Sequence, residues 1–171
     1  ADMGLDRLSD PSDPLYISDD APAKLSDAKD LFYDQDNDTF WVCDSGNNRI
    51  LRLDTDLKVT GCYTGFTGST EISVGEDGKS TFLNPNGIYV KKSIFDDKLY
   101  VYIADTDNSR AVKCTVESGT EMTLVQEYTK PDTKLYDSET FNPSKILADK
   151  AENIYVVCCL LYTSPSPRDR Q

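Results

Sequence analysis

Histidine is absent from the 171 residues, and its absence excludes every mechanism that depends on an imidazole. Hydrolysis by Ser-His-Asp or Cys-His groups, the helical zinc motif with two histidines and histidine phosphotransfer are therefore ruled out within this chain. Basic residues are also scarce, with 18 Lys and Arg against 30 Asp and Glu. The resulting formal charge of −12 argues against binding to nucleic acid or to an anionic membrane surface. No apolar run approaches the ~20 residues that span a bilayer.

The composition that remains is that of a polar but folded protein. Hydrophobic residues make up 38% of the chain and aromatic residues 10%, which suffices for a core. No stretch shows the 3.6-residue period of an amphipathic helix, so we expect little helix. Short aromatic and β-branched runs bounded by Asp, Asn and Gly instead predict strands. The first four are expected at 31–33, 39–43, 49–53 and 59–64.

The most informative feature is an internal repeat. The run from Phe40 to Ile50 recurs from Val101 to Ala111, so that 61 residues separate the equivalent Asp44 and Asp105. A loop-then-strand element precedes each copy, and a third copy begins at Phe141 but stops where its own signature would start. The second copy carries an insertion near 92–97, which lengthens it beyond the ~40 to 45 residues of a compact blade. Four antiparallel strands per copy predict the blades of a β-propeller.

Asp-Ser-Gly-Asn-Asn-Arg at 44–49, between an aromatic-Val strand and an aliphatic strand, resembles the signature of the NHL repeat family. The start Asn-Pro-x-Gly-Ile at 84–88 strengthens the resemblance, although the first copy has Ala-Lys-Asp at 28–30 where Pro-x-Gly is usual. The resemblance covers about residues 25–158. It implies an all-β fold, a partial β-propeller of two to three four-stranded antiparallel blades that does not close. A ring needs at least four blades, and the family usually has about six.

The repeat register divides the chain into segments. Residues 1–24 are an acidic segment that is either a degraded blade edge or a linker. Blade 1 is expected at 25–66, a connecting loop at 67–81, blade 2 at 82–128, a second connecting loop at 129–140 and the first half of blade 3 at 141–158. We expect the unpaired strands at both ends of this array to be exposed edges that favour aggregation.

Residues 159–171 differ in composition from everything before them. Read as codons, they resemble one reading frame of the transposon-end adapter used in making sequencing libraries. We therefore expect a non-native tail from adapter read-through in a metagenomic gene fragment, with a genuine Ser/Pro-rich linker as the alternative. The chain would then be a truncated piece of a longer protein.

The candidate functional residues are those of the repeat signature. The Asp and Asn side chains suit a tight turn, Gly46 suits a positive φ, and Arg49 is expected to bind Asp44 bidentately. This interpretation makes the residues mainly structural, and direct contact with a ligand is the alternative, because propeller loops gather at one mouth of the ring. The set consists of Asp44, Gly46, Asn47, Asn48, Arg49, Asp105, Asn108 and Arg110.

Alternating carboxylates at Asp34, Asp36 and Asp38 imitate the start of a calcium loop. The sixth position is Thr39 rather than Gly and the twelfth is Ser45 rather than Glu, so a hairpin tip is the preferred interpretation. We expect no cofactor and no resident metal. Pairs of neighbouring acids at 76–77 and 96–97 are expected to be solvated loop charges rather than catalytic carboxylates.

By resemblance, the parent protein is a non-catalytic scaffold that presents its propeller face to a protein, a glycan or a small-molecule ligand. Acidic NHL proteins of bacteria are often secreted or attached to the cell surface, so we expect an extracellular or surface location. The alternative is an enzyme, because six-bladed propeller lactonases and lyases hold a central divalent metal with Glu, Asp and Asn from several blades.

Cysteines and aromatic residues complete the expectations. Cys43 and Cys62 would flank the strand at 49–53 at about 9 to 10 Å from each other, too far for a disulfide. One equivalent position in the three copies carries Trp41, Tyr102 and Tyr155. This recurrence favours packing between blades, with lining of a binding surface as the alternative.

Overall fold

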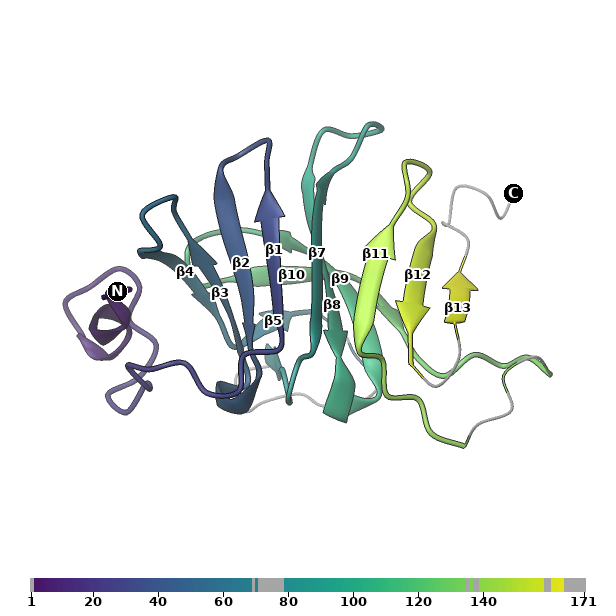
Figure 1. Ribbon diagram of the computed structural model, residues 1–171, viewed down its shortest axis with the longest axis horizontal. Coiled ribbons are helices and arrows are strands. Elements are labelled where there is room, and N and C mark those ends of the chain that lie inside the picture. The colour runs from purple at the N-terminus through teal and green to yellow at the C-terminus, as the bar shows by residue number, and fades with distance from the viewer. Residues whose placement is uncertain are drawn as a thin grey trace.

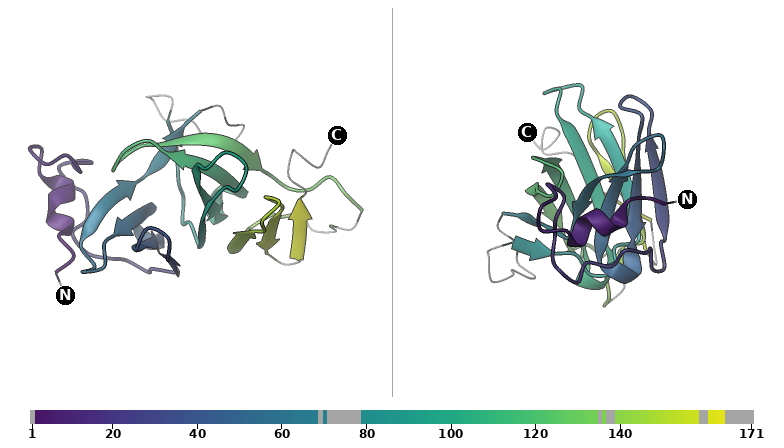
Figure 2. Two further views of the ribbon diagram at one scale, coloured as in Figure 1. Left: turned by 90° about the horizontal axis from the view of Figure 1, so that it is seen from above. Right: turned by 90° about the vertical axis from the view of Figure 1, so that its left-hand side faces the viewer.

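The computed structural model describes residues 2–68, 70, 79–134, 136, 139–158 and 161–164. Within these ranges thirteen strands form three sheets, and the helices are three short 3-10 turns (Figure 1). The sheets follow one another along an arc that does not close (Figure 2). No helix in the described ranges is long and apolar enough to cross a membrane.

The first sheet is blade 1, a four-stranded antiparallel meander. Its strands are β1 (Asp30–Asp34), β2 (Thr39–Asp44), β3 (Arg49–Leu53) and β4 (Val59–Tyr63). The four predicted strands are confirmed to within one residue at each end. Asp44 lies opposite Arg49 in the β2–β3 register, which places the signature at the turn between these strands.

Blade 2 contains four antiparallel strands and an additional hairpin. The four strands are β7 (Gly87–Lys92), β8 (Leu99–Asp105), β9 (Arg110–Val116) and β10 (Met122–Tyr128). The hairpin of β5 (Gly65–Thr67) and β6 (Lys79–Thr81) joins this sheet through a parallel pairing of β5 with β10. The prediction of a connecting loop over 67–81 was therefore wrong at both of its ends. Residues 69 and 71–78, including the acidic pair at 76–77, lie outside the described residues.

Blade 3 consists of β11 (Lys145–Ala148), β12 (Ile154–Val157) and β13 (Leu161–Ser164) in antiparallel order. It was expected to end at 158, but β13 lies within the predicted tail and pairs with β12 over four residues. The rest of the tail, 159–160 and 165–171, lies outside the described residues.

Apolar side chains fill the two spaces between blades. The space between blades 1 and 2 is formed around Trp41, Ile50, Tyr63, Val101 and Ile103. Blade 3 packs on blade 2 through a second cluster, which includes Tyr102, Ala104, Ala111, Ile146, Ile154 and Val156. Alternate residues of β8 therefore face opposite neighbours, as the two-residue period of a strand requires.

Residues 2–21 contain no strand and pack on blade 1, so this part of the predicted acidic segment is not a linker. This stretch, the N-terminal segment, contains the 3-10 turn η1 (Leu5–Ser9) and packs on blade 1. Leu5, Leu8 and Leu15 are buried there against residues of β2, β3 and β4. An apolar residue every three to seven positions in an otherwise acidic stretch is the sequence signal for this contact.

The four described cysteines, Cys43, Cys62, Cys114 and Cys158, lie outside disulfides. The prediction that Cys43 and Cys62 are not bridged is confirmed. Both lie opposite neighbouring residues of β3, Cys43 beside Ile50 and Cys62 beside Leu51. Burial raises the pKa of the Cys43 and Cys114 thiols, so neither is a reactive thiolate near neutral pH.

Candidate functional site

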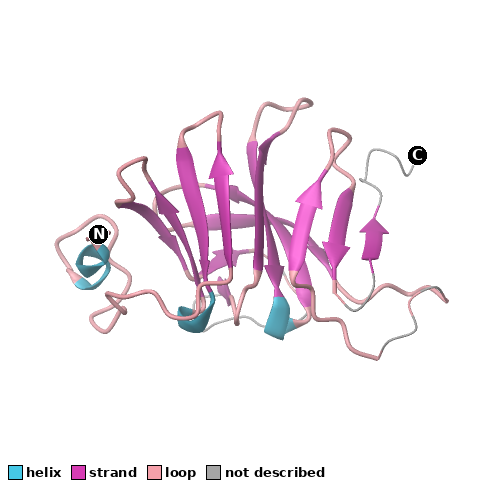
Figure 3. Cartoon of the chain, viewed as in Figure 1, coloured by secondary structure: helices cyan, strands magenta, loops and turns pink. Residues whose placement is uncertain are grey.

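Both copies of the signature fold in the same way. Each begins with an aspartate that ends the second strand of its blade, continues through the 3-10 turns η2 (Ser45–Asn47) or η3 (Thr106–Asn108), and ends at an arginine that begins the third strand. A residue with positive φ closes each turn, Asn48 at 55° and Ser109 at 53°. These turns lie at the lower end of the blades (Figure 3).

Gly46 does not supply the positive φ, contrary to the sequence prediction, because Asn48 does so instead. Gly46 is needed for a close approach. Its amide donates to the Ser26 carbonyl oxygen at 2.8 Å, and a Cβ at this position would lie 2.7 Å from the same oxygen. The loop that leads into the first strand of the blade, here called the entry loop, therefore passes directly over the backbone of the turn.

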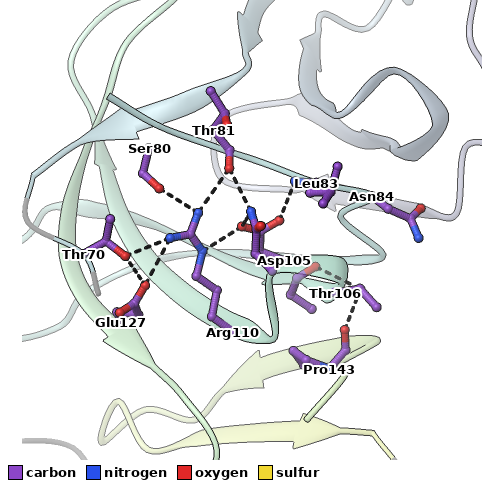
Figure 4. Close-up of polar contacts among 12 residues, drawn as sticks. Thr70, Ser80, Thr81, Leu83, Asn84, Asp105, Thr106, Arg110, Glu127 and Pro143 are labelled. Atoms are coloured by element: carbon purple, nitrogen blue, oxygen red, sulfur yellow. Dashed lines mark hydrogen bonds and ion pairs between the residues drawn. The ribbon is translucent and has the colours of Figure 1, made fainter. Parts of the chain in front are cut away.

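The aspartate of each signature is buried and accepts several hydrogen bonds. Asp105 Oδ1 accepts from the Leu83 amide at 2.8 Å, and Oδ2 accepts from Asn108 Nδ2 at 2.9 Å and from Arg110 Nε at 2.8 Å (Figure 4). Burial raises the pKa of Asp105, and these three donors oppose the effect. The carboxylate thus ties the entry loop, the turn and the third strand of one blade together.

The first copy repeats this arrangement. Asp44 Oδ1 accepts from the Ser26 amide at 2.8 Å, and Oδ2 accepts from Asn47 Nδ2 at 3.0 Å and from Arg49 Nε at 2.7 Å. The predicted bidentate Arg49–Asp44 pair was wrong, because Arg49 Nη2 donates to the Pro22 carbonyl oxygen at 2.8 Å. The sequence spacing was enough to predict that Arg49 and Asp44 pair. The number of hydrogen bonds between them depends on the segment at Pro22, which lies beside the guanidinium and accepts from Nη2.

Arg110 uses all five of its N–H groups within the protein. Beyond Asp105, Nη1 donates to Thr70 Oγ1 at 2.9 Å and to Glu127 Oε2 at 3.1 Å. Nη2 donates to Ser80 Oγ at 2.8 Å and to the Thr81 carbonyl oxygen at 3.2 Å. A guanidinium has five donors, so none is left for a ligand. Arg110 therefore holds the β5–β6 hairpin to the body of blade 2.

A hydroxyl in each signature also connects its blade to the next one. Thr106 Oγ1 donates to the Pro143 carbonyl oxygen of blade 3 at 2.6 Å. The equivalent Ser45 donates to the Pro85 carbonyl oxygen at the start of blade 2. The signature therefore builds its own turn and fixes the position of the following blade.

The three aspartates considered as calcium ligands form a hairpin turn between β1 and β2. Asp34 accepts from the Asp36 amide at 3.2 Å and from Asn37 Nδ2 at 2.8 Å, while Asp38 accepts from Tyr33 Oη at 2.6 Å. In the described part of the chain, no three His, Cys, Asp or Glu residues converge as metal ligands would. Asp34 is directed into the turn, whereas Asp36 and Asp38 are exposed.

A second buried polar cluster, between blades 2 and 3, was not predicted. Lys113 Nζ lies 3.1 Å from Glu152 Oε2 and 4.1 Å from the centre of the Tyr100 ring. Ser93 donates to the other oxygen of Glu152. A lysine inside the apolar run of β9 was the available sequence signal, but its partner comes from a turn 39 residues further along.

The first strands of the blades, here called the inner strands (β1, β7 and β11), are also connected through one charged side chain. Lys145 Nζ of β11 lies 3.2 Å from Asp30 Oδ1 of β1, and it donates to the carbonyl oxygens of Lys29 at 3.2 Å and Asn86 at 3.3 Å. Lys145 belongs to blade 3, and these partners belong to blade 1 and to the start of blade 2. The Lys145 side chain therefore reaches past blade 2 to blade 1. The residue of blade 2 that is equivalent to Lys145 is Gly87.

The recurring aromatic position lies between blades in the first two copies. Trp41 stacks on Tyr63 with ring centroids 5.8 Å apart, and Tyr102 packs against Tyr89 at 6.2 Å. Each is 1% exposed. The third member, Tyr155, is half-buried and donates to Asp149. Trp41 and Tyr102 are therefore placed for packing between blades rather than for lining an open surface.

The opposite end of the blades presents a different surface. The β1–β2, β7–β8 and β11–β12 turns project at the upper edge of the molecule (Figure 1). The β7–β8 turn contains the insertion, where Ile94 is 69% exposed and Phe95 50% exposed. The turns of blades 1 and 3 carry polar residues and one alanine at these positions.

No protein-family model matches the chain. No curated protein matches it either. Among solved structures, it is similar to hydrazine synthase of Kuenenia stuttgartiensis with a TM-score of 0.53 and 15% identity, over 90% of this chain and 37% of that chain. A streptogramin B lyase structure matches with a TM-score of 0.43 and 17% identity, over 88% of this chain and 44% of that chain. This chain therefore spans less than half of either structure.

The predicted fold class is confirmed: the protein is all-β, a partial propeller whose sheets do not close into a ring.

Proposed function

We propose that this chain is part of a non-catalytic NHL-type propeller scaffold that binds a protein, glycan or small-molecule ligand on its hairpin-turn face. This face consists of the turns at 35–38, 93–98 and 149–153. The observation that carries the proposal is the contrast between the two ends of the blades. At the end of the blades that carries the two signature turns, the pairs Asp44–Arg49 and Asp105–Arg110 are buried and bonded within the protein. At the other end, Asp36, Asp38 and Asp97 are exposed.

Two properties of the hairpin-turn face support binding there. Asp36, Asp38 and Asp97 are exposed, so the face is acidic and favours a neutral or basic ligand. Ile94 and Phe95 project from a turn that is anchored at its base by the buried Ser93. Adjacent exposed apolar residues on an ordered turn are typical of recognition surfaces. We place the parent protein outside the bacterial cell or on its surface, as the family resemblance implies.

The test is binding of the full chain to a glycan array and to a peptide array. Ile94→Ser/Phe95→Ser should reduce any signal at least about tenfold, as expected when anchor residues of an interface are truncated. Leu83→Ser is the matched control, because Leu83 is 43% exposed but lies at the signature end. Equal loss with the control variant would overturn the placement of the site.

The alternative function is a metal-dependent propeller enzyme of the lactonase or lyase type. Thermal unfolding of the full chain with added Ca²⁺ or Zn²⁺ separates the two functions. A scaffold held together by Asp105, Arg110 and their partners should show no metal-dependent rise in Tm. A large rise, abolished by substitution of acidic residues on the inner strands, would favour the enzyme and contradict our proposal.

A further inference from the structure

We propose that the N-terminal segment, residues 2–21, takes the place of a propeller blade against blade 1 and prevents a second copy of the chain from stacking there. The internal repeat identifies the equivalent faces of blades 1 and 2. In blade 2, the side chains that face blade 1 include Val101, Ile103, Val112 and Cys114, all fully buried. In blade 1, the equivalent face is not covered by another blade of the described residues.

The equivalent residues of blade 1 are nevertheless covered. Val42 and Leu51 correspond to Ile103 and Val112, and both lie in a cluster with Leu5, Leu8 and Leu15 of the N-terminal segment. Leu8 is fully buried in this cluster. Figure 2 shows η1 lying across the strands of blade 1. The segment therefore buries the surface that a preceding blade would bury.

The segment also protects the outer edge of blade 1. The Val59 amide of β4 donates to the Met3 carbonyl oxygen at 2.8 Å, and Arg7 Nη1 donates to the Val59 carbonyl oxygen at 3.1 Å. Further along β4, the Cys62 amide donates to Gly119 of the β9–β10 turn at 2.8 Å. The exposed edge that the sequence predicted at this end is thus occupied, which removes a site for strand addition.

The segment has the construction of a cap. Arg7 Nε donates to Asp13 at 2.8 Å, and the Ile17 amide donates to the Leu8 carbonyl oxygen at 2.8 Å, so the segment holds its own shape. Its outward side chains are mainly acidic, namely Asp2, Asp6, Asp10, Asp19 and Asp20. A polar outer face over an apolar inner face is what terminal caps provide in repeat proteins.

The occupant that the cap excludes is blade 3 of a second copy. On blade 3, Leu147 and Val157 correspond to Tyr89 and Ala104 of blade 2, which pack against the next blade. Leu147 is 47% exposed and Val157 46% exposed. Blade 3 therefore offers the same kind of surface that blade 2 uses to receive a blade. Stacking it on an uncapped blade 1 would be a head-to-tail contact.

Cysteine labelling of the full chain tests the cap directly. Cys62 lies beneath the cap, whereas Cys43 and Cys114 lie between blades 1 and 2. Leu8→Asp should increase the rate of Cys62 alkylation at least about 30-fold while Cys43 and Cys114 stay protected, because the cap opens and the blades remain packed. The same variant should increase in mass with concentration by light scattering. Leu25→Asp is the control, since Leu25 is 41% exposed, and it should behave as the unmodified chain.

Three results would overturn the proposal. Unchanged Cys62 labelling in the variant would show that the segment does not cover this face. Simultaneous labelling of Cys43 and Cys114 in Leu8→Ala, a milder variant that retains its β-sheet signal, would show that the segment is an integral part of the blade core. A variant that exposes Cys62 but stays monomeric at all concentrations would show that the segment does not block association.

Discussion

Lys113 Nζ and Glu152 Oε2 lie 3.1 Å apart across the boundary between blades 2 and 3, and both side chains are buried. Ser93 adds a hydrogen bond to the carboxylate, and the Tyr100 ring faces the ammonium. Each charge is therefore compensated by the neighbouring blade. This pair makes the position of blade 3 depend on chemistry as well as on apolar packing.

Removing one member of this pair should be costly. We expect Glu152→Gln to lower the free energy of unfolding by about 3 kcal/mol, because Lys113 would remain buried without its counter-charge. Urea denaturation followed by circular dichroism measures the change. Asp97→Asn is the control, since Asp97 pairs with Lys92 at 3.1 Å on the surface and should cost about 0.5 kcal/mol or less. Equal costs for both variants would contradict the prediction.

The signature arginine should not tolerate lysine. Arg110 donates to five oxygen atoms in a planar arrangement that an ammonium cannot reproduce. We expect Arg110→Lys to destabilise the protein by about 3 kcal/mol, because buried acceptors lose their donors. The control is Arg7→Lys, where the side chain is 43% exposed. Denaturation midpoints that shift equally in both variants would show that the network adds nothing specific.

Gly87 lies at a close approach between β7 of blade 2 and the start of β11 of blade 3. A Cβ at this position would lie 2.6 Å from the Ser144 carbonyl oxygen and 2.9 Å from Lys145 Cα. Both neighbours are backbone, so neither can move aside cheaply. We expect Gly87→Ala to cost about 1 to 3 kcal/mol and to displace blade 3. Faster amide exchange confined to β7 and β11 is the expected signature, and unchanged exchange there would contradict it.

Asp149 should contribute to acid sensitivity. Hydrogen bonds from Asn153, Tyr155 and Ala151 hold the pKa of Asp149 below its ordinary value, the Asn153 side chain most of all. A depressed folded-state pKa stabilises the protein above the unfolded-state pKa, and this contribution is lost as the pH falls through the folded-state value. Asp149→Asn should therefore be less stable than the unmodified chain at pH 7.

The difference between the two proteins should vanish at a pH well below the ordinary value of 3.8. Denaturation curves at a series of pH values measure it. Asp105 has the opposite sign, because burial raises its pKa and its contribution weakens as the pH rises through the folded-state value. Comparing Asp149→Asn with the unmodified chain at each pH removes that shared contribution. A difference that stays constant with pH would contradict the prediction.

The amino-acid sequence by itself determined the blade pattern. Period-two strands and the recurrence of Asp44 at Asp105 were enough to locate β1 to β4 and both signatures. These features are local, since turn residues and strand alternation act over a few positions. The pairing of each signature aspartate with its arginine was readable for the same reason, because only four residues lie between them.

Only the tertiary structure decided what fills the space between distant segments. The packing of the N-terminal segment could not be predicted, because its three buried leucines have no strand period and their partner surface lies on blade 1. The pairing of β5 with β10 and the Lys113–Glu152 pair could not be predicted, because each joins residues far apart in the chain. Burial of such charges and edges depends on which blades become neighbours, and that is a property of the assembled arc.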